Sequence, residues 1–239
     1  MIKVSIPIFI TVRSDTEENK QKNVQLLPYA YEYLKSQQTL HRCIVISKDD
    51  DILEYAKALG FKNVYKEKCI NCKYCHIEYM GIYHHMQDFP GDYDWFINFK
   101  IDQPFKSDNL LVDAIRLINY NLDFITSASQ MTDRERMYIN DDNKFIQLMD
   151  NADRNFDKCM RTFMIDLSVV ACKTSFFKKC VESKDFYKIF WSGKYDVIKN
   201  YSMFIQIMSS EQIRRFNLAS DIYEKVKLLP KFEDINKGD

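Results

Sequence analysis

The apolar residues of this chain gather in short runs rich in Ile, Val and Phe, and these runs alternate with longer stretches whose apolar positions recur at helical spacing. The first run, residues 7–14, has no helical period, which predicts a strand buried on both faces of a parallel sheet. Further apolar runs predict strands at residues 41–47, 61–65, 93–101 and 122–129.

The stretches between these runs predict helices at residues 26–40, 49–58, 79–89 and 107–118. The second helix begins with Asp residues, which the helix dipole favours, and Gly60 follows its end. Ser107 is the predicted N-cap of the fourth helix. Strands that alternate with helices at short intervals are typical of βαβ units with right-handed crossovers. The pattern predicts the α/β class, with a Rossmann-like, mostly parallel sheet sandwiched by helices.

A hairpin is predicted beyond the fifth strand, where residues 138–140 and 145–149 flank the turn at 141–143. We expect it to be inserted in the sheet as an arm at about residues 132–163. The chain is then a single α/β domain over residues 1–229, followed by a polar tail at residues 230–239.

Charge and hydropathy narrow the function classes. The 34 basic and 34 acidic residues give a formal net charge of zero, which argues against a general nucleic-acid binder. No apolar run approaches the roughly 20 residues of a membrane span. No signal peptide precedes the first strand, so we expect a cytoplasmic protein without a membrane partner. The seven cysteines are then expected to be reduced thiols or metal ligands.

The polar loop predicted after the first strand is the first candidate site. Ligands of α/β sheets collect at the carboxyl ends of the strands, and this loop offers Arg13, Ser14, Lys22 and Asn23. It has no glycine, so a bound phosphate would be held mainly by side chains. A solvated surface loop is the alternative, because nearby carboxylates offset the cations.

The end of the fourth predicted strand carries Asp102 and Gln103. A carboxylate at the carboxyl end of a central strand commonly holds a Mg²⁺ ion bound to nucleotide phosphates. Asp102 is therefore the best candidate for a metal ligand. The alternative is an Asp that forms a turn ahead of Pro104.

A cysteine cluster lies between the third strand and the third helix. Cys69, Cys72 and Cys75 are spaced at two-residue gaps and His76 follows them, which suits zinc or part of an iron–sulfur site. The alternative is a set of small buried thiols on one helix face.

Several of these segments, in order, resemble the cytidylyltransferases that make CMP-sialic acid and CMP-KDO. Residues 12–24 resemble the family's nucleotide-binding signature, with Arg13, Ser14, Lys22 and Asn23 at matching positions. Residues 97–105 resemble the segment whose Asp binds metal in the CMP-KDO synthetases, and Asp102 occupies its place. Residues 164–177 resemble a later strand with its following helix.

The chain also departs from the family pattern. Family Gly, Lys and Gly residues of the signature are replaced by Asp15, Glu17 and Glu18. Residues 204–212 resemble a segment with two aspartates that help hold magnesium, and Gln206 and Met208 stand in their places. A thioether cannot replace a carboxylate as a ligand of a hard cation. These departures argue against normal activity.

The resemblance implies transfer of CMP from CTP, or another nucleotide, to an acidic sugar, with release of pyrophosphate and with Mg²⁺ as cofactor. Arg13 and Lys22 would neutralise phosphates as catalytic residues, and Ser14, Asn23 and Gln103 would bind the nucleotide. Arginines around the arm would bind the sugar carboxylate: Arg134, Arg136 and Arg161, with Arg154 nearby. The resemblance also implies that the arm packs on a second subunit of a homodimer.

Two alternatives to this activity remain. A catalytically silent nucleotide- or sugar-binding protein on the same scaffold fits the lost glycines and aspartates. A glycosyltransferase that uses a finished nucleotide-sugar ranks lowest.

Overall fold

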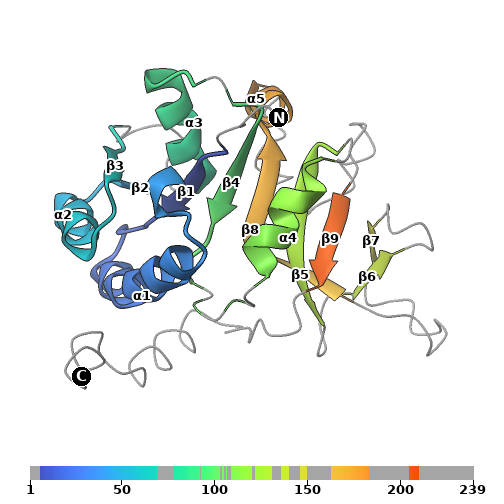
Figure 1. Cartoon of the computed structure of the whole chain (residues 1–239), viewed down its shortest axis with the longest axis horizontal. Helices are drawn as coiled ribbons and strands as arrows, with labels where there is room; N and C mark the ends of the chain where they lie inside the picture. Colours follow the sequence, from blue (N-terminus) through green and yellow to red (C-terminus); the bar gives the residue numbers. More distant parts are fainter. Residues whose placement is uncertain are drawn as a thin grey trace. The chain divides into compact units, whose positions relative to one another are not determined.

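The computed structural model describes residues 6–68, 78–91, 93–102, 104, 106, 109–119, 122–130, 136–139, 146–149, 163–182 and 205–209. Figure 1 labels their helices and strands. They form two compact units, one from residues within Pro7–Asp92 and Phe99–Lys106, the other from residues within Tyr93–Asn98 and Ser107–Ile213.

The first unit contains a three-stranded parallel sheet in the order β3-β2-β1. Its strands are β1 (Ile8–Thr11), β2 (Cys43–Ser47) and β3 (Asn63–Lys66). Every residue of β1 is buried, as expected for a strand that is covered on both faces. Figure 1 shows this cover, with α3 on one side of the strands and α1 with α2 on the other. The three strands predicted from apolar runs are confirmed here.

Three helices complete the first unit: α1 (Glu17–Ser36), α2 (Asp50–Leu59) and α3 (Glu78–Asp88), with a short 3₁₀ turn at Leu40–Arg42. The ends of α2 are those predicted. Asp49 caps its start by accepting a hydrogen bond from the Asp51 N–H at 2.9 Å. Gly60 ends it in the left-handed conformation, at φ 111°.

Helix α1 corrects the sequence prediction of a polar loop followed by a helix at residues 26–40. It begins at Glu17, because the Thr16 side chain caps it by accepting a hydrogen bond from the Asn19 N–H at 3.1 Å. Glu17 and Glu18 occupy the first turn, where the helix dipole favours carboxylates. Glu17 and Glu18, which stand where the resembling family has Lys and Gly, therefore start a helix here.

The core of the first unit is formed by large apolar side chains from α1, β1 and the segments around them. Leu26, Leu27 and Leu34 of α1 are fully buried, and so is Ile8 of β1. Burial of one such side chain contributes about 1.5–3 kcal/mol. This packing holds the end of β1 against the first turns of α1, where the candidate site lies.

The second unit contains β4 (Trp95–Phe99, whose last residue belongs to the first unit), β8 (Phe163–Lys173), β5 (Phe124–Gln130) and β9 (Ile205–Ser209). Strand β4 neighbours β8, β8 pairs antiparallel with β5, and β5 pairs parallel with β9. Helix α4 (Leu110–Leu117) packs against β5 and β8, and α5 (Thr174–Glu182) packs against β8.

The start of α4 differs from the prediction of a helix that Ser107 caps. The helix begins at Leu110 after Asn109, whose side chain makes no capping hydrogen bond. Just before it, the Lys106 ammonium donates to the Lys100 carbonyl at 2.6 Å. This contact joins Lys106 to the residue that follows strand β4. Ser107 itself lies outside the described residues.

The predicted hairpin is present as two paired strands, β6 (Arg136–Ile139) and β7 (Ile146–Met149). They are antiparallel, with Arg136 opposite Met149 and Ile139 opposite Ile146. The turn between them and the tail at 230–239 lie outside the described residues. The single domain at 1–229 with an arm at about 132–163 stays a prediction. No helix in the described part of the chain is long and apolar enough to cross a membrane.

Candidate functional site

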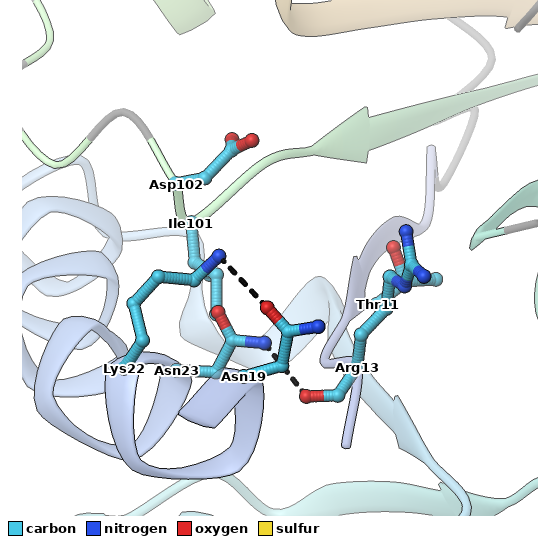
Figure 2. A pocket seen from close by; sticks show the side chains of 7 residues that line it. All are labelled: Thr11, Arg13, Asn19, Lys22, Asn23, Ile101 and Asp102. Atoms are coloured by element: carbon cyan, nitrogen blue, oxygen red, sulfur yellow. Dashed lines mark hydrogen bonds between the residues drawn. The ribbon is translucent and has the colours of Figure 1, made fainter. Parts of the chain in front are cut away.

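A polar cavity lies at the carboxyl end of β1, within the first unit. Its walls come from the end of β1, the first turns of α1 and the residues after β4 (Figure 2): Thr11, Arg13, Asn19, Lys22, Asn23, Ile101 and Asp102. The cavity volume is about 90 Å³. Pockets for a whole drug-sized ligand are roughly 300–1,000 Å³, so this cavity is suited to one group of a larger ligand.

Helix α1 brings three polar side chains to the cavity. Asn19, Lys22 and Asn23 stand three and four residues apart, which places them on one helix face. Asn23 is 5% exposed, and its Nδ2 donates to the Arg13 carbonyl at 2.7 Å. This bond ties the turn after β1 to the helix.

The Lys22 ammonium points into the cavity (Figure 2). Its Nζ donates to Asn19 Oδ1 at 3.3 Å, and among the described residues it forms no ion pair. Lys20 differs, because its ammonium lies 2.8 Å from an Asp49 oxygen and 2.6 Å from an Asp51 oxygen. Hydrogen bonds to Asp49 and Asp51 raise the pKa of Lys20. Lys22 is therefore the α1 cation that is available to a ligand.

Arg13 and Asp15 form an ion pair beside the cavity. The Arg13 guanidinium donates to Asp15 Oδ2 at 2.6 Å, and the two side chains are 32% and 43% exposed. Partial burial raises the pKa of Asp15, but the hydrogen bond and the charge of Arg13 outweigh it, so this pKa lies below its usual value. The pair is charged at neutral pH.

Two buried oxygens of the cavity have no hydrogen-bond partner among the described residues. They are Oδ1 of Asp102 and Oγ1 of Thr11, whose residue is 7% exposed. A buried polar group without a partner costs about 1–3 kcal/mol. Mg²⁺ prefers oxygen ligands and is usually held by one or two carboxylates with substrate phosphates and waters. A carboxylate oxygen and a hydroxyl oxygen are the type of ligand that such an ion prefers.

Lys106 positions the loop that carries Asp102. It is 8% exposed, its Nζ donates to the Lys100 carbonyl at 2.6 Å, and the same Nζ lies 4.3 Å from the centroid of the Phe99 ring. Both contacts favour the charged amine. They tie Lys106 to Phe99 and Lys100, the residues that precede Ile101 and Asp102.

The structure brings together the four predicted residues Arg13, Lys22, Asn23 and Asp102. Ser14 is described but does not line the cavity. Several other predicted residues lie outside the described part of the chain: Gln103, Arg134, Arg154, Arg161, Cys69, Cys72, Cys75 and His76. Arg136 lies on β6, where only the backbone is described. Among the described residues, no three His, Cys, Asp or Glu side chains form a metal site.

Sequence reasoning missed Thr11, Asn19 and Lys106. Thr11 is the last residue of β1, the strand position from which a side chain reaches the carboxyl edge of the sheet. Asn19 stands four residues before Asn23, a spacing that indicates a shared face once the helix start is known. Lys106 gives no such signal, because its burial depends on how the loop closes.

Comparisons with known proteins give matches at the level of structure. No protein-family model and no curated protein matches the chain. CMP:2-keto-3-deoxy-manno-octonic acid synthetase, solved with CTP, matches with a TM-score of 0.69 and 12% identity, over 93% of this chain and 97% of that chain. The chain has the fold of the cytidylyltransferases.

Two further structures share this cytidylyltransferase fold. The 4-diphosphocytidyl-2C-methyl-D-erythritol synthase of Anaerococcus prevotii matches with a TM-score of 0.55 and 12% identity, over 94% of this chain and 98% of that chain. The bifunctional IspDF of Campylobacter jejuni matches with a TM-score of 0.56 and 15% identity, over 88% of this chain and 51% of that chain. The predicted α/β class with a Rossmann-like sheet is confirmed.

Proposed function

We propose that the chain is a nucleotidyltransferase that uses CTP, and that the cavity at the end of β1 binds the triphosphate. One observation carries the proposal: Lys22, Arg13 and the unpartnered Oδ1 of Asp102 meet at one polar cavity. Two cations beside a carboxylate are suited to phosphate groups that bring a divalent cation. The structural neighbour solved with CTP supports this choice of nucleotide.

The chemistry follows from the charges in the site. A sugar hydroxyl attacks the α-phosphorus of CTP, a new P–O bond forms, and the bond to the bridging oxygen of pyrophosphate breaks. Negative charge develops on the leaving pyrophosphate, where Arg13 and Lys22 neutralise it. Asn23 contributes by holding the Arg13 backbone in place at 2.7 Å. Rate enhancement comes from positioning and charge neutralisation.

Asp102 and Thr11 are the residues that would hold Mg²⁺. When bound, the ion supplies charge neutralisation at the phosphate oxygens. Gln206 and Met208 lie on strand β9. They stand where the resembling family has two aspartates and offer no carboxylate, so metal binding depends on Asp102 and on the nucleotide. We expect nucleotide binding to be retained more fully than turnover.

An acidic sugar is the proposed acceptor, and arginines around the hairpin arm are its proposed ligands: Arg134, Arg136 and Arg161. Arg suits this role because its planar fork binds a carboxylate through two hydrogen bonds. The proposal includes a cytoplasmic homodimer in which the arm packs on the second subunit.

A second candidate is a catalytically silent binding protein on the same scaffold. The start of α1 favours it, because Asp15, Glu17 and Glu18 put carboxylates where a glycine-rich cradle would offer backbone N–H groups to phosphate. The missing carboxylates at Gln206 and Met208 point the same way.

Pyrophosphate release distinguishes the two candidates. The protein is incubated with CTP, Mg²⁺ and a panel of acidic sugars, alongside the isosteric variants Asp102→Asn and Asp113→Asn. Asp113 lies on α4 in an exposed pair with Arg116 and serves as the control. The proposal predicts release that falls at least about 100-fold in Asp102→Asn and stays unchanged in Asp113→Asn. No release with any sugar would support the silent protein, and release unaffected by Asp102→Asn would overturn the metal role of Asp102.

A further inference from the structure

Asp15 is held by two residues of the cavity. Its Oδ2 accepts from the Arg13 guanidinium at 2.6 Å, and its Oδ1 accepts from Asn19 Nδ2 at 3.2 Å. Asn19 in turn accepts from the Lys22 ammonium at 3.3 Å, the bond drawn between them in Figure 2. The Asp15 carboxylate is thus bound by the Arg13 guanidinium and the Asn19 amide at the edge of the cavity. Lys22, the other cation of the cavity, is linked to them through Asn19.

The start of helix α1 does not use this carboxylate as its cap. The helix cap of α1 is the Thr16 side chain, and the acids of the first helical turn are Glu17 and Glu18. Asp15 precedes the cap, and besides a local backbone hydrogen bond it bonds the side chains of Arg13 and Asn19. Its two acceptor oxygens face donors that are also suited to phosphate oxygens.

We propose that Asp15 is an internal counter-anion of this site, which an incoming phosphate group must displace from Arg13 and Asn19. The proposal rests on the proposed function, since it assumes that Arg13 and Lys22 bind phosphate. Displacement costs little free energy because the ion pair is partly exposed, and exposed ion pairs contribute little to stability. A phosphate with two or more charges offers Arg13 a stronger partner than Asp15 does.

The consequence is a gain in affinity when Asp15 loses its charge. Asp15→Asn keeps the side-chain shape and removes the charge that competes with phosphate for Arg13, so inorganic pyrophosphate should bind about three- to five-fold more tightly by isothermal titration calorimetry. Glu18→Gln is the matched control, because it removes one exposed negative charge from the start of the same helix without touching Arg13. It should change the affinity by less than about 1.5-fold.

A second readout follows the displaced group itself. Titration of the Asp15 carboxyl, monitored by ¹³C NMR, should give a pKa below the usual value for Asp in the free protein. Saturation with pyrophosphate should raise that pKa, because Arg13 no longer bonds to the carboxylate. Circular dichroism of each variant checks that the fold is kept.

The outcomes separate this inference from the proposed function. Suppose that Asp15→Asn binds pyrophosphate no more tightly than the parent protein, while binding by the parent still depends on Lys22. This result would overturn the role of Asp15 and leave the proposed function standing. An equal gain in Glu18→Gln would also overturn it, because the effect would then be general charge. Absence of pyrophosphate and CTP binding in all forms would overturn the proposed function and this inference with it.

Discussion

His85 of helix α3 is a half-buried titratable group in the first unit. Its ring packs edge-on against Phe9, at 5.1 Å between centroids, and against Tyr65, at 5.0 Å. Its Nδ1 is buried and has no hydrogen-bond partner in the described part of the chain. Burial lowers the pKa of His85, and the nearby Asp88 charge opposes this only in part. The folded protein therefore favours the neutral ring.

This lowered pKa predicts loss of stability in mild acid. The unfolded chain binds a proton at His85 near the ordinary pKa of about 6.5, while the folded chain resists it. The contribution of His85 to the free energy of unfolding is present above pH of about 6.5 and is lost as the pH falls toward the folded pKa. His85→Phe keeps an aromatic ring and should flatten this dependence.

Urea unfolding at several values between about pH 5 and pH 8 measures the effect. His41→Gln, which removes a histidine from an exposed position, is the control. If the parent protein and His85→Phe lose the same free energy of unfolding across this range, the prediction is wrong.

At the scale of elements, α1 shows what the sequence could and could not predict. Its apolar period starts only near Leu26, because the first turns present Asn19, Lys22 and Asn23 to the polar cavity. Periodicity therefore placed the helix start too late. The signal for the true start is the Thr16 cap followed by two glutamates, which is a matter of local chemistry.

The strands and helix α2 were easier to predict. Strands β1 and β2 are buried on both faces, so their sequences are continuous apolar runs. Asp49 and Gly60 mark the ends of α2 with residues whose physical roles are specific. The carboxyl ends of the strands were the predicted place of the candidate sites. Arg13, Lys22, Asn23 and Asp102 line one cavity there. Lys106 could not be found this way, because its partner is a backbone carbonyl of a loop.

Gly60 gives a stability prediction at the end of α2. Its φ of 111° is costly for other residues, and a Cβ atom there would lie 2.6 Å from the Tyr31 hydroxyl oxygen. Gly60→Ala should lower the free energy of unfolding by about 1–2 kcal/mol, measured by urea denaturation. Gly60→Asn should lose less, because Asn adopts the left-handed conformation more readily. An alanine variant as stable as the parent would show that this turn is not constrained.

At the scale of the whole molecule, the cytidylyltransferase fold is shared with solved structures at 12–15% identity. Folds host many functions, so activity has to be argued from the site. The order of weak motifs along the chain was enough to predict this fold. The sugar site stays a prediction, because Arg134 and Arg161 lie outside the described residues and only the backbone of Arg136 is described.

The proposed function requires that the cavity at the end of β1 binds the phosphates of CTP. Lys22 tests this most directly, since it lines the cavity and forms no ion pair among the described residues. Lys35, on the same helix, is 57% exposed and pairs with Glu32, so Lys35→Ala is the matched control.

The decisive measurement is isothermal titration of CTP with Mg²⁺ into the parent protein, Lys22→Ala and Lys35→Ala. A charge-assisted hydrogen bond to a phosphate contributes about 1.5–3 kcal/mol, so Lys22→Ala should bind CTP about 10- to 100-fold more weakly. Lys35→Ala should bind like the parent. CTP binding that is equal in all three proteins, or absent from the parent, would contradict the account.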